Sequence, residues 1–151
     1  MKLDTVDKIL DFAIEKEQEA SQFYSDLAAR VKKQYMKDIF EQFALEEKSH
    51  EAKLKEIKSG NLDLSPMDQK VTNLKIVDTL VDVDLEGDFD YQQALIVAMK
   101  SEKASYKLYN DLAGLTDDQK IKDVFFSLAQ EEAKHKLRFE IEYDENVLKE
   151  N

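Results

Sequence analysis

Four segments of the chain carry apolar side chains at spacings of three and four residues, which is the period of an amphipathic helix. They run over about 4–31, 34–58, 91–113 and 117–148. Only short turns separate the first segment from the second and the third from the fourth. Each of these pairs is therefore predicted to form an antiparallel helical hairpin.

Capping signals accompany the predicted helix ends. Asp90 and Gln93 have the spacing of a capping box at the start of the third segment, and Thr116 and Gln119 have it at the start of the fourth. Gly60 follows the second segment and suits a C-terminal cap.

The residues between the hairpins, 60–89, do not continue the helical period. Ser65-Pro66 is typical of an N-cap followed by proline at the first helical position, so a short helix is predicted over about 66–80. The following stretch, 81–88, is acidic and irregular. We interpret 60–89 as the long crossover that joins the hairpins of some four-helix bundles.

The two hairpins are related by an internal repeat. Aligning 11–56 with 96–141, an offset of 85 residues, gives fourteen identities in forty-six positions. The repeat predicts an all-α fold, a four-helix bundle made of two duplicated antiparallel hairpins, 4–58 and 91–148. A length of 151 residues is that of a single domain covering 1–151.

The composition narrows the possible functions. The chain has one proline, three glycines and no cysteine, which favours helix and excludes disulfides, thiolate catalysis and cysteine-ligated metal sites. A net charge of −11 argues against nucleic acid as a partner. The sequence shows no signal-peptide pattern and no apolar run of about 20 residues, so we expect a cytoplasmic protein without a membrane span.

Both histidines of the chain close a Glu-x-x-His phrase, and the two phrases occupy equivalent positions of the repeat. An inward glutamate on the preceding segment of each hairpin obeys the same offset. The whole set is Glu17, Glu47, His50, Glu102, Glu132 and His135. Residues three apart share one face of a helix, so Glu and His of each phrase can bind one metal centre. Exposed Glu–His pairs are the alternative for either phrase alone, but the common offset favours a metal site.

The chemistry of these six side chains suits two metal ions. Two imidazoles and four carboxylates form a ligand set for iron or manganese, with zinc as an alternative, at a separation of about 3.5–4 Å. Phe40 and Phe43 precede the first phrase, and Phe125 and Leu128 precede the second. Carboxylates in such apolar surroundings repel one another unless cations neutralise them.

Two tyrosines also obey the repeat. Tyr24 and Tyr109 lie two helical turns after Glu17 and Glu102 on the same stripe. They are candidates for hydrogen bonds to the ligand carboxylates, which would help to hold the metal centre. Packing in the core is the alternative interpretation.

Together these phrases resemble the rubrerythrin-like branch of the ferritin-like di-iron carboxylate proteins. The matching phrases are Glu17-x-x-Ala20-x-x-x-Tyr24, Glu47-x-x-His50, Glu102-x-x-Ser105-x-x-x-Tyr109 and Glu132-x-x-His135. With their helices they cover the chain apart from the crossover and the termini. The resemblance implies a ferritin-like four-helix bundle and a non-haem di-iron centre held by the six ligands. It also implies redox chemistry with peroxide or dioxygen.

The chain departs from full-length rubrerythrins in two ways. Those proteins carry a rubredoxin-type domain held by cysteines, which this chain lacks, so we expect an external electron donor such as a rubredoxin-like carrier. They also usually bring an additional carboxylate on the third helix, where this chain has Ser105. The symmetric six-ligand set is therefore more similar to a generic di-iron carboxylate centre.

Our leading hypothesis is a di-iron oxidoreductase that reacts with peroxide or dioxygen, with a role in oxidative stress. One alternative is an iron-handling protein that oxidises or buffers ferrous iron without efficient peroxidase turnover. Another is an interaction bundle that holds adventitious zinc. A homodimer is compatible with the way related bundles pair along helices, but the sequence does not locate an interface.

Overall fold

A computed structural model describes residues 3–60 and 90–145 of the chain. These residues form four helices and no strand. The helices are α1 (Val6–Arg30), α2 (Gln34–Ser59), α3 (Tyr91–Ala113) and α4 (Gln119–Tyr143). The predicted short helix at 66–80, the rest of the crossover and the predicted last turn of the fourth helix lie outside the described residues.

The chain divides into two compact units, Met1–Thr72 and Asn73–Asn151, and each unit contains one of the predicted hairpins. That the whole of 1–151 acts as a single domain stays a prediction. None of the described helices has the length and apolar character needed to cross a membrane.

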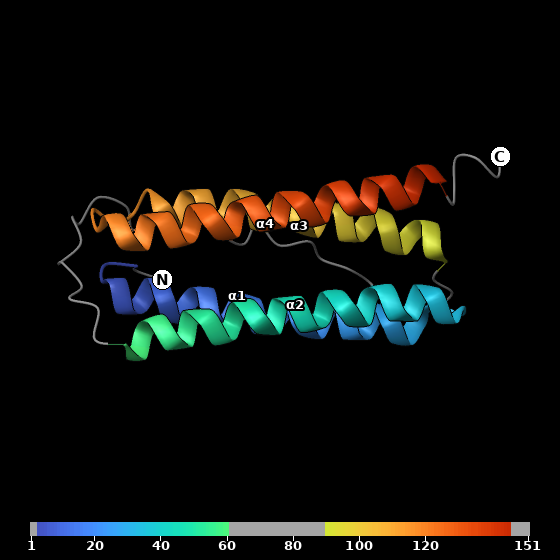
Figure 1. Cartoon of the computed structure of the whole chain (residues 1–151), viewed down its shortest axis with the longest axis horizontal. Coiled ribbons are helices and arrows are strands. Elements are labelled where there is room, and N and C mark those ends of the chain that lie inside the picture. Colours follow the sequence, from blue (N-terminus) through green and yellow to red (C-terminus); the bar gives the residue numbers. More distant parts are fainter. Residues whose placement is uncertain (1–2, 61–89, 146–151) are drawn as a thin grey trace. The chain divides into compact units, whose positions relative to one another are not determined.

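The first unit contains α1 and α2, which pack side by side in opposite directions (Figure 1). Thr5 caps α1, because its hydroxyl accepts a hydrogen bond of 3.1 Å from the backbone N–H of Lys8. Three residues, 31–33, join the two helices, and Gly60 forms the C-terminal cap of α2, as predicted. The short connection accounts for the antiparallel pairing.

The second unit contains α3 and α4, again packed in opposite directions (Figure 1). The predicted capping box at the start of α3 is confirmed. The side chain of Asp90 accepts from the backbone N–H of Gln93 at 2.8 Å, and the side chain of Gln93 accepts from the backbone N–H of Asp90 at 3.1 Å. Two otherwise unsatisfied donors at the helix start are thereby paired.

The predicted capping box at the start of α4 is wrong. Asp118, not Thr116, is the N-cap, and its carboxylate accepts from the backbone N–H groups of Lys120 and Ile121. Thr116 is buried and instead accepts from the backbone N–H of Asp118 at 3.1 Å. The hydroxyl thus stabilises the turn before the helix, while the carboxylate two residues later satisfies the helix itself.

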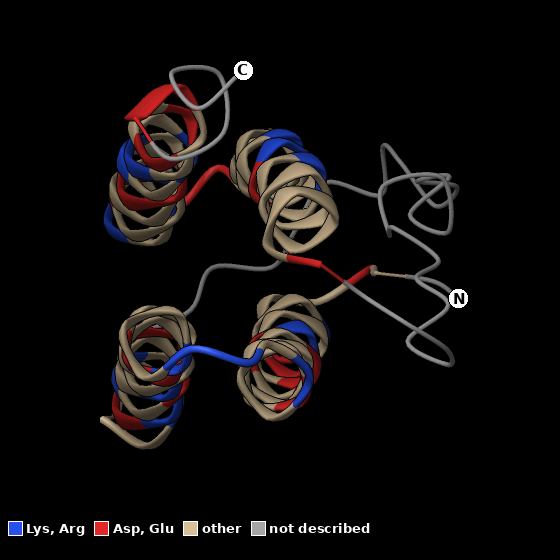
Figure 2. Cartoon of the chain, turned by 90° about the vertical axis from the view of Figure 1, so that its right-hand side faces the viewer, with Lys and Arg blue, Asp and Glu red and all other residues tan. Residues whose placement is uncertain are grey.

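The connections within the two hairpins carry opposite charges. Lys32 and Lys33 occupy the connection from α1 to α2, whereas Asp117 and Asp118 occupy the one from α3 to α4 (Figure 2). Lys33 is the N-cap of α2 and makes no capping hydrogen bond through its side chain. The start of α2 therefore lacks the side-chain acceptor that α4 has.

Aromatic packing repeats between the hairpins. The rings of Tyr24 and Phe40 stack with their centroids 6.4 Å apart, and those of Tyr109 and Phe125 stack at 6.0 Å. Each of these pairs joins the two helices of one hairpin, and all four rings are 0–1% exposed. Burying an aromatic side chain contributes about 1.5–3 kcal/mol, so these pairs are a main source of hairpin stability.

In each hairpin, a lysine near the start of the second helix donates a hydrogen bond to the C-terminal end of the first helix. Lys37 donates from its ammonium to the carbonyl oxygen of Ala28 at 3.4 Å, and Lys122 donates to that of Ala113 at 3.2 Å. Carbonyls in the last turn of a helix have no partner within the helix, and a cation there complements the helix dipole. The predicted duplication thus extends to individual hydrogen bonds.

Candidate metal centre

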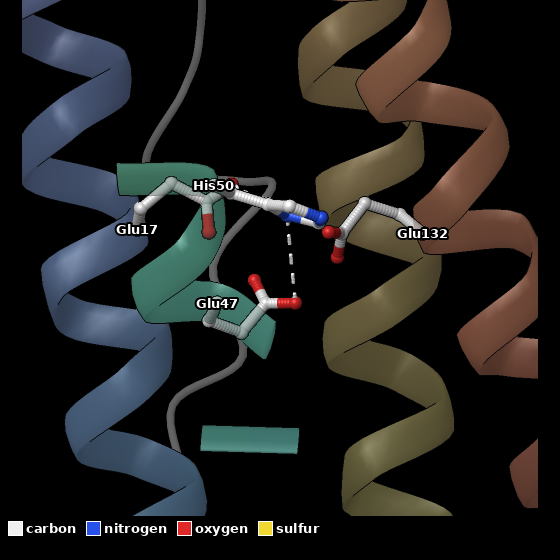
Figure 3. Close-up of side chains that lie close together, drawn as sticks. All are labelled: Glu17, Glu47, His50 and Glu132. Carbon is white, nitrogen blue, oxygen red and sulfur yellow. Dashed lines mark ion pairs between the residues drawn. The ribbon is translucent and has the colours of Figure 1, made fainter. Parts of the chain in front are cut away.

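In the first hairpin, three of the predicted ligands come together as a set that we call the first donor set: Glu17, Glu47 and His50. One ligand atom from each lies within 4.8 Å of the others. Nδ1 of His50 is 3.6 Å from Oε1 of Glu17 and 3.8 Å from Oε1 of Glu47. Figure 3 shows the glutamate of α1 and the two residues of α2 pointing toward one another.

Helix geometry explains this arrangement. Glu47 and His50 are one turn apart on α2, so both project toward α1. Phe43 lies one turn before Glu47 and Leu54 one turn after His50, and both are fully buried. The donor set therefore interrupts an apolar stripe, and its three members are only 1–5% exposed.

In the second hairpin, Glu102, Glu132 and His135 form the second donor set. One ligand atom from each again lies within 4.8 Å of the others. Nδ1 of His135 is 3.5 Å from Oε1 of Glu102. Both glutamates are 1% exposed, whereas the side chain of His135 is 12% exposed. The repeat predicted from the sequence thus extends to the arrangement of the donor atoms.

The donor chemistry of each set fits a divalent transition metal. Two carboxylates and one imidazole suit iron, manganese or zinc, whereas calcium and magnesium prefer oxygen ligands alone. Buried carboxylates a few ångströms apart repel one another, and a cation between them removes that conflict. Both donor sets therefore have the composition and burial that a metal centre requires.

The two predicted supporting tyrosines lie in the cores of their hairpins. Tyr24 and Tyr109 are each 1% exposed and stack on phenylalanine rings of the neighbouring helix. This position agrees with the packing interpretation. A hydrogen bond from either hydroxyl to a ligand carboxylate stays a prediction.

Ser21 is a residue near the first donor set that the sequence did not single out. Its hydroxyl is buried and donates a hydrogen bond of 3.0 Å to the carbonyl oxygen of Ala44. Ser21 lies one turn after Glu17, and Ala44 lies one turn before Glu47, so the bond links the two helices beside the donor set. The repeat gave no signal, because the equivalent residue of the second hairpin is Tyr106.

Comparison with solved structures shows that another protein has a similar fold. Among solved structures, a hypothetical protein from Pyrococcus furiosus is similar to this chain with a TM-score of 0.64 and 24% identity. The similarity covers 91% of this chain and 87% of that one, and at this identity it shows the fold alone. The predicted all-α fold, a ferritin-like four-helix bundle, is confirmed by the four described helices together with the family model that matches the chain.

The model of the Rubrerythrin family matches residues 8–143, which include all six predicted ligands. The chain belongs to the Rubrerythrin family, a ferritin-like di-iron family. The resemblance stated from the sequence is therefore confirmed, and membership supports a di-iron carboxylate protein. No curated protein matches the chain.

Proposed function

We propose that the chain is a di-iron oxidoreductase that reduces peroxide, with dioxygen as an alternative oxidant. The observation that carries the proposal is the duplicated donor set, two buried glutamates and one histidine in each hairpin of a Rubrerythrin family member. The two sets would together supply the six ligands of one di-iron centre. Manganese or zinc could occupy the same ligands, but only a redox-active metal supports the reaction.

Iron in this centre would supply one electron per ion and Lewis acidity toward the O–O bond. The protein's part follows from the donor sets. The four glutamates would bind the ions and neutralise their charge, and each histidine would supply one uncharged nitrogen ligand from its own donor set. The apolar residues along the same stripes, such as Phe43 and Leu54, would limit the access of water. Limiting water protects a reactive centre from side reactions.

Reduction of peroxide to water consumes two electrons and two protons, so a reductant must return the iron to the ferrous state. The chain contains no cysteine that could hold a second iron site. We therefore propose a separate electron-donor protein, such as a rubredoxin-like carrier, in the same cytoplasmic compartment. A role in oxidative stress would follow from this activity.

The test is peroxide consumption by the reduced, iron-loaded chain in the presence of a chemical reductant. We expect turnover faster than that of the same concentration of free ferrous iron. Glu132→Ala should abolish the excess, because it removes a ligand that is 1% exposed within the second donor set. Glu131→Ala, at the neighbouring position about 100° around the helix, is the matched control.

The outcome separates the three functions that the sequence left open. Consumption no faster than that of free iron would contradict the peroxidase. If such a chain still oxidised stoichiometric ferrous iron with dioxygen, it would instead be an iron-handling protein. Zinc in place of iron, in protein made under iron supply, would support a bundle that holds adventitious metal.

A further inference from the structure

Two hydrogen bonds join α1 to α2 beside the first donor set. The hydroxyl of Ser21 donates to the carbonyl oxygen of Ala44, and the side-chain amide of Gln18 donates to the carboxylate of Glu51, each at 3.0 Å. Both donors belong to α1 and both acceptors belong to α2. The two bonds therefore fix how the two helices are placed against each other at this level of the hairpin.

Both bonds lie close to the ligands. On α1, Gln18 directly follows Glu17, and Ser21 lies one turn after it. On α2, Glu51 directly follows His50, and the carbonyl that accepts from Ser21 lies one turn before the other ligand of that helix. A shift of one helix against the other would lengthen both bonds as it moved the ligands apart. The two bonds thus hold the donor atoms of the first set near one another before metal binds.

The second hairpin has different residues at the positions that make these bonds. Lys103 and Lys136 replace the glutamine and the glutamate, and two ammonium groups are both donors and carry like charges. Lys136 instead pairs with Glu140 of its own helix. Tyr106 replaces the serine and is 38% exposed, whereas the serine is buried. Within residues 90–145, the second donor set therefore lacks both of these links.

The two donor sets also differ in their access to water. The side chain of His50 is 6% exposed, whereas that of His135 is 12% exposed. Water that reaches a ligand competes with it for the metal and with the metal for the ligand. The second donor set is therefore both less constrained and closer to solvent than the first.

We propose that Ser21 and Gln18 are positioning residues for the first donor set, and that this set consequently binds its metal ion more tightly than the second set does. The inference rests on the proposed metal centre and adds an order of loading to it. Both sets offer two carboxylates and one imidazole, so donor chemistry does not distinguish them. The difference comes from preorganisation, because donor groups that are already held in place lose less conformational freedom when the metal binds.

The test is a titration of the metal-free full chain with Co²⁺, in competition with a chromophoric chelator. We expect two binding steps whose dissociation constants differ at least about tenfold, which is the effect of ordering one additional side chain. His50→Ala should abolish the tight step, because it removes a ligand of the first donor set. His135→Ala should keep the tight step and abolish the weak one.

Ser21→Ala and Gln18→Met should each weaken the tight step about tenfold and leave the weak step unchanged. A general loss of stability would weaken both steps, so the unequal response separates positioning from a structural role. Gln22→Met is the matched control, because Gln22 donates to Asp26 at 2.8 Å within α1 and makes no link to α2. It should leave both steps unchanged. Circular dichroism of each variant verifies that the helices are intact, and Gln18 is exposed, so its replacement is compatible with folding.

Two Co²⁺ ions bound with equal affinity would overturn the inference and leave the metal centre intact. The same holds for a tight step that persists in His50→Ala, or one that neither Ser21→Ala nor Gln18→Met weakens. A chain that binds no Co²⁺ would overturn the metal centre and the inference together. Failure of the order of loading is thus distinguishable from failure of the proposed function.

Discussion

Replacing Glu47 by glutamine should stabilise the metal-free chain. Glu47 is 1% exposed, and its ligand atom lies within 4.8 Å of the one from Glu17. Two negative charges at this distance repel each other by about 3.5 kcal/mol at an effective dielectric constant of about 20. Burying a carboxylate costs several kcal/mol more. The lost contact with His50, at 3.8 Å, offsets part of the gain. A buried amide also costs about 1–3 kcal/mol when it does not find hydrogen-bond partners, so we expect a net increase of only about 1–2 kcal/mol in the free energy of unfolding.

With metal bound, the parent chain should become more stable than the Glu47→Gln variant. A metal that binds only the folded chain adds about 2.7 kcal/mol of stability when its free concentration is 100 times the dissociation constant. The parent chain should show this gain with ferrous iron. The Glu47→Gln variant should show little or none, because an amide is a weaker ligand than a carboxylate for these ions. The variant is thus expected to be the more stable protein without metal and the less stable one with it.

Urea unfolding followed by circular dichroism measures both states under anaerobic conditions, with and without ferrous iron. Glu46→Gln is the control, because it changes the neighbouring carboxylate about 100° around the same helix. That variant should keep the metal-dependent gain. A Glu47→Gln variant that is less stable than the parent without metal would contradict the repulsion between the carboxylates, and one that keeps the full stabilisation by iron would contradict the assignment of Glu47 as a ligand.

Three further predictions concern the hairpins themselves. Lys33→Asp should raise the free energy of unfolding by about 1 kcal/mol in thermal or urea unfolding, because it gives α2 the capping side chain that Asp118 gives α4. Phe125→Ala should lower the same quantity by about 3–5 kcal/mol, since this ring is fully buried. A hydrogen bond from Lys55 lowers the pKa of Glu51 in the folded chain, so this carboxylate stabilises the fold above its unfolded-state pKa, and the contribution is lost as pH falls through the lower folded-state pKa. Lys55→Met should therefore raise the pKa of Glu51 in an NMR titration, and an unchanged pKa would contradict the assignment.

The sequence predicted the helices and the donor sets because both depend on periodicity. Glu47 and His50 are one turn apart, so any helix that buries one of them turns the other to the same side. The offset of the repeat then predicted the same arrangement for Glu132 and His135. The structure confirms that each pair approaches a glutamate of the preceding helix in its own hairpin.

The choice between two neighbouring candidate caps could not be predicted from periodicity. Thr116 and Asp118 are both good caps, and the spacing of Gln119 favoured the wrong one. The structure assigns the cap to Asp118 because its carboxylate reaches two backbone N–H groups at once. The exposed apolar residues of α4, such as Phe126, were not predicted either, because the inward stripe alone accounted for the helical period.

The proposed function requires that the donor sets of both hairpins together hold one pair of iron ions. This requirement can be tested by X-ray absorption spectroscopy at the iron edge of the reduced, iron-loaded full chain. We expect two irons per chain, nitrogen and oxygen ligands, and an iron–iron distance of about 3.5–4 Å. Iron bound without a second iron at that distance would contradict it, because each donor set would then act alone.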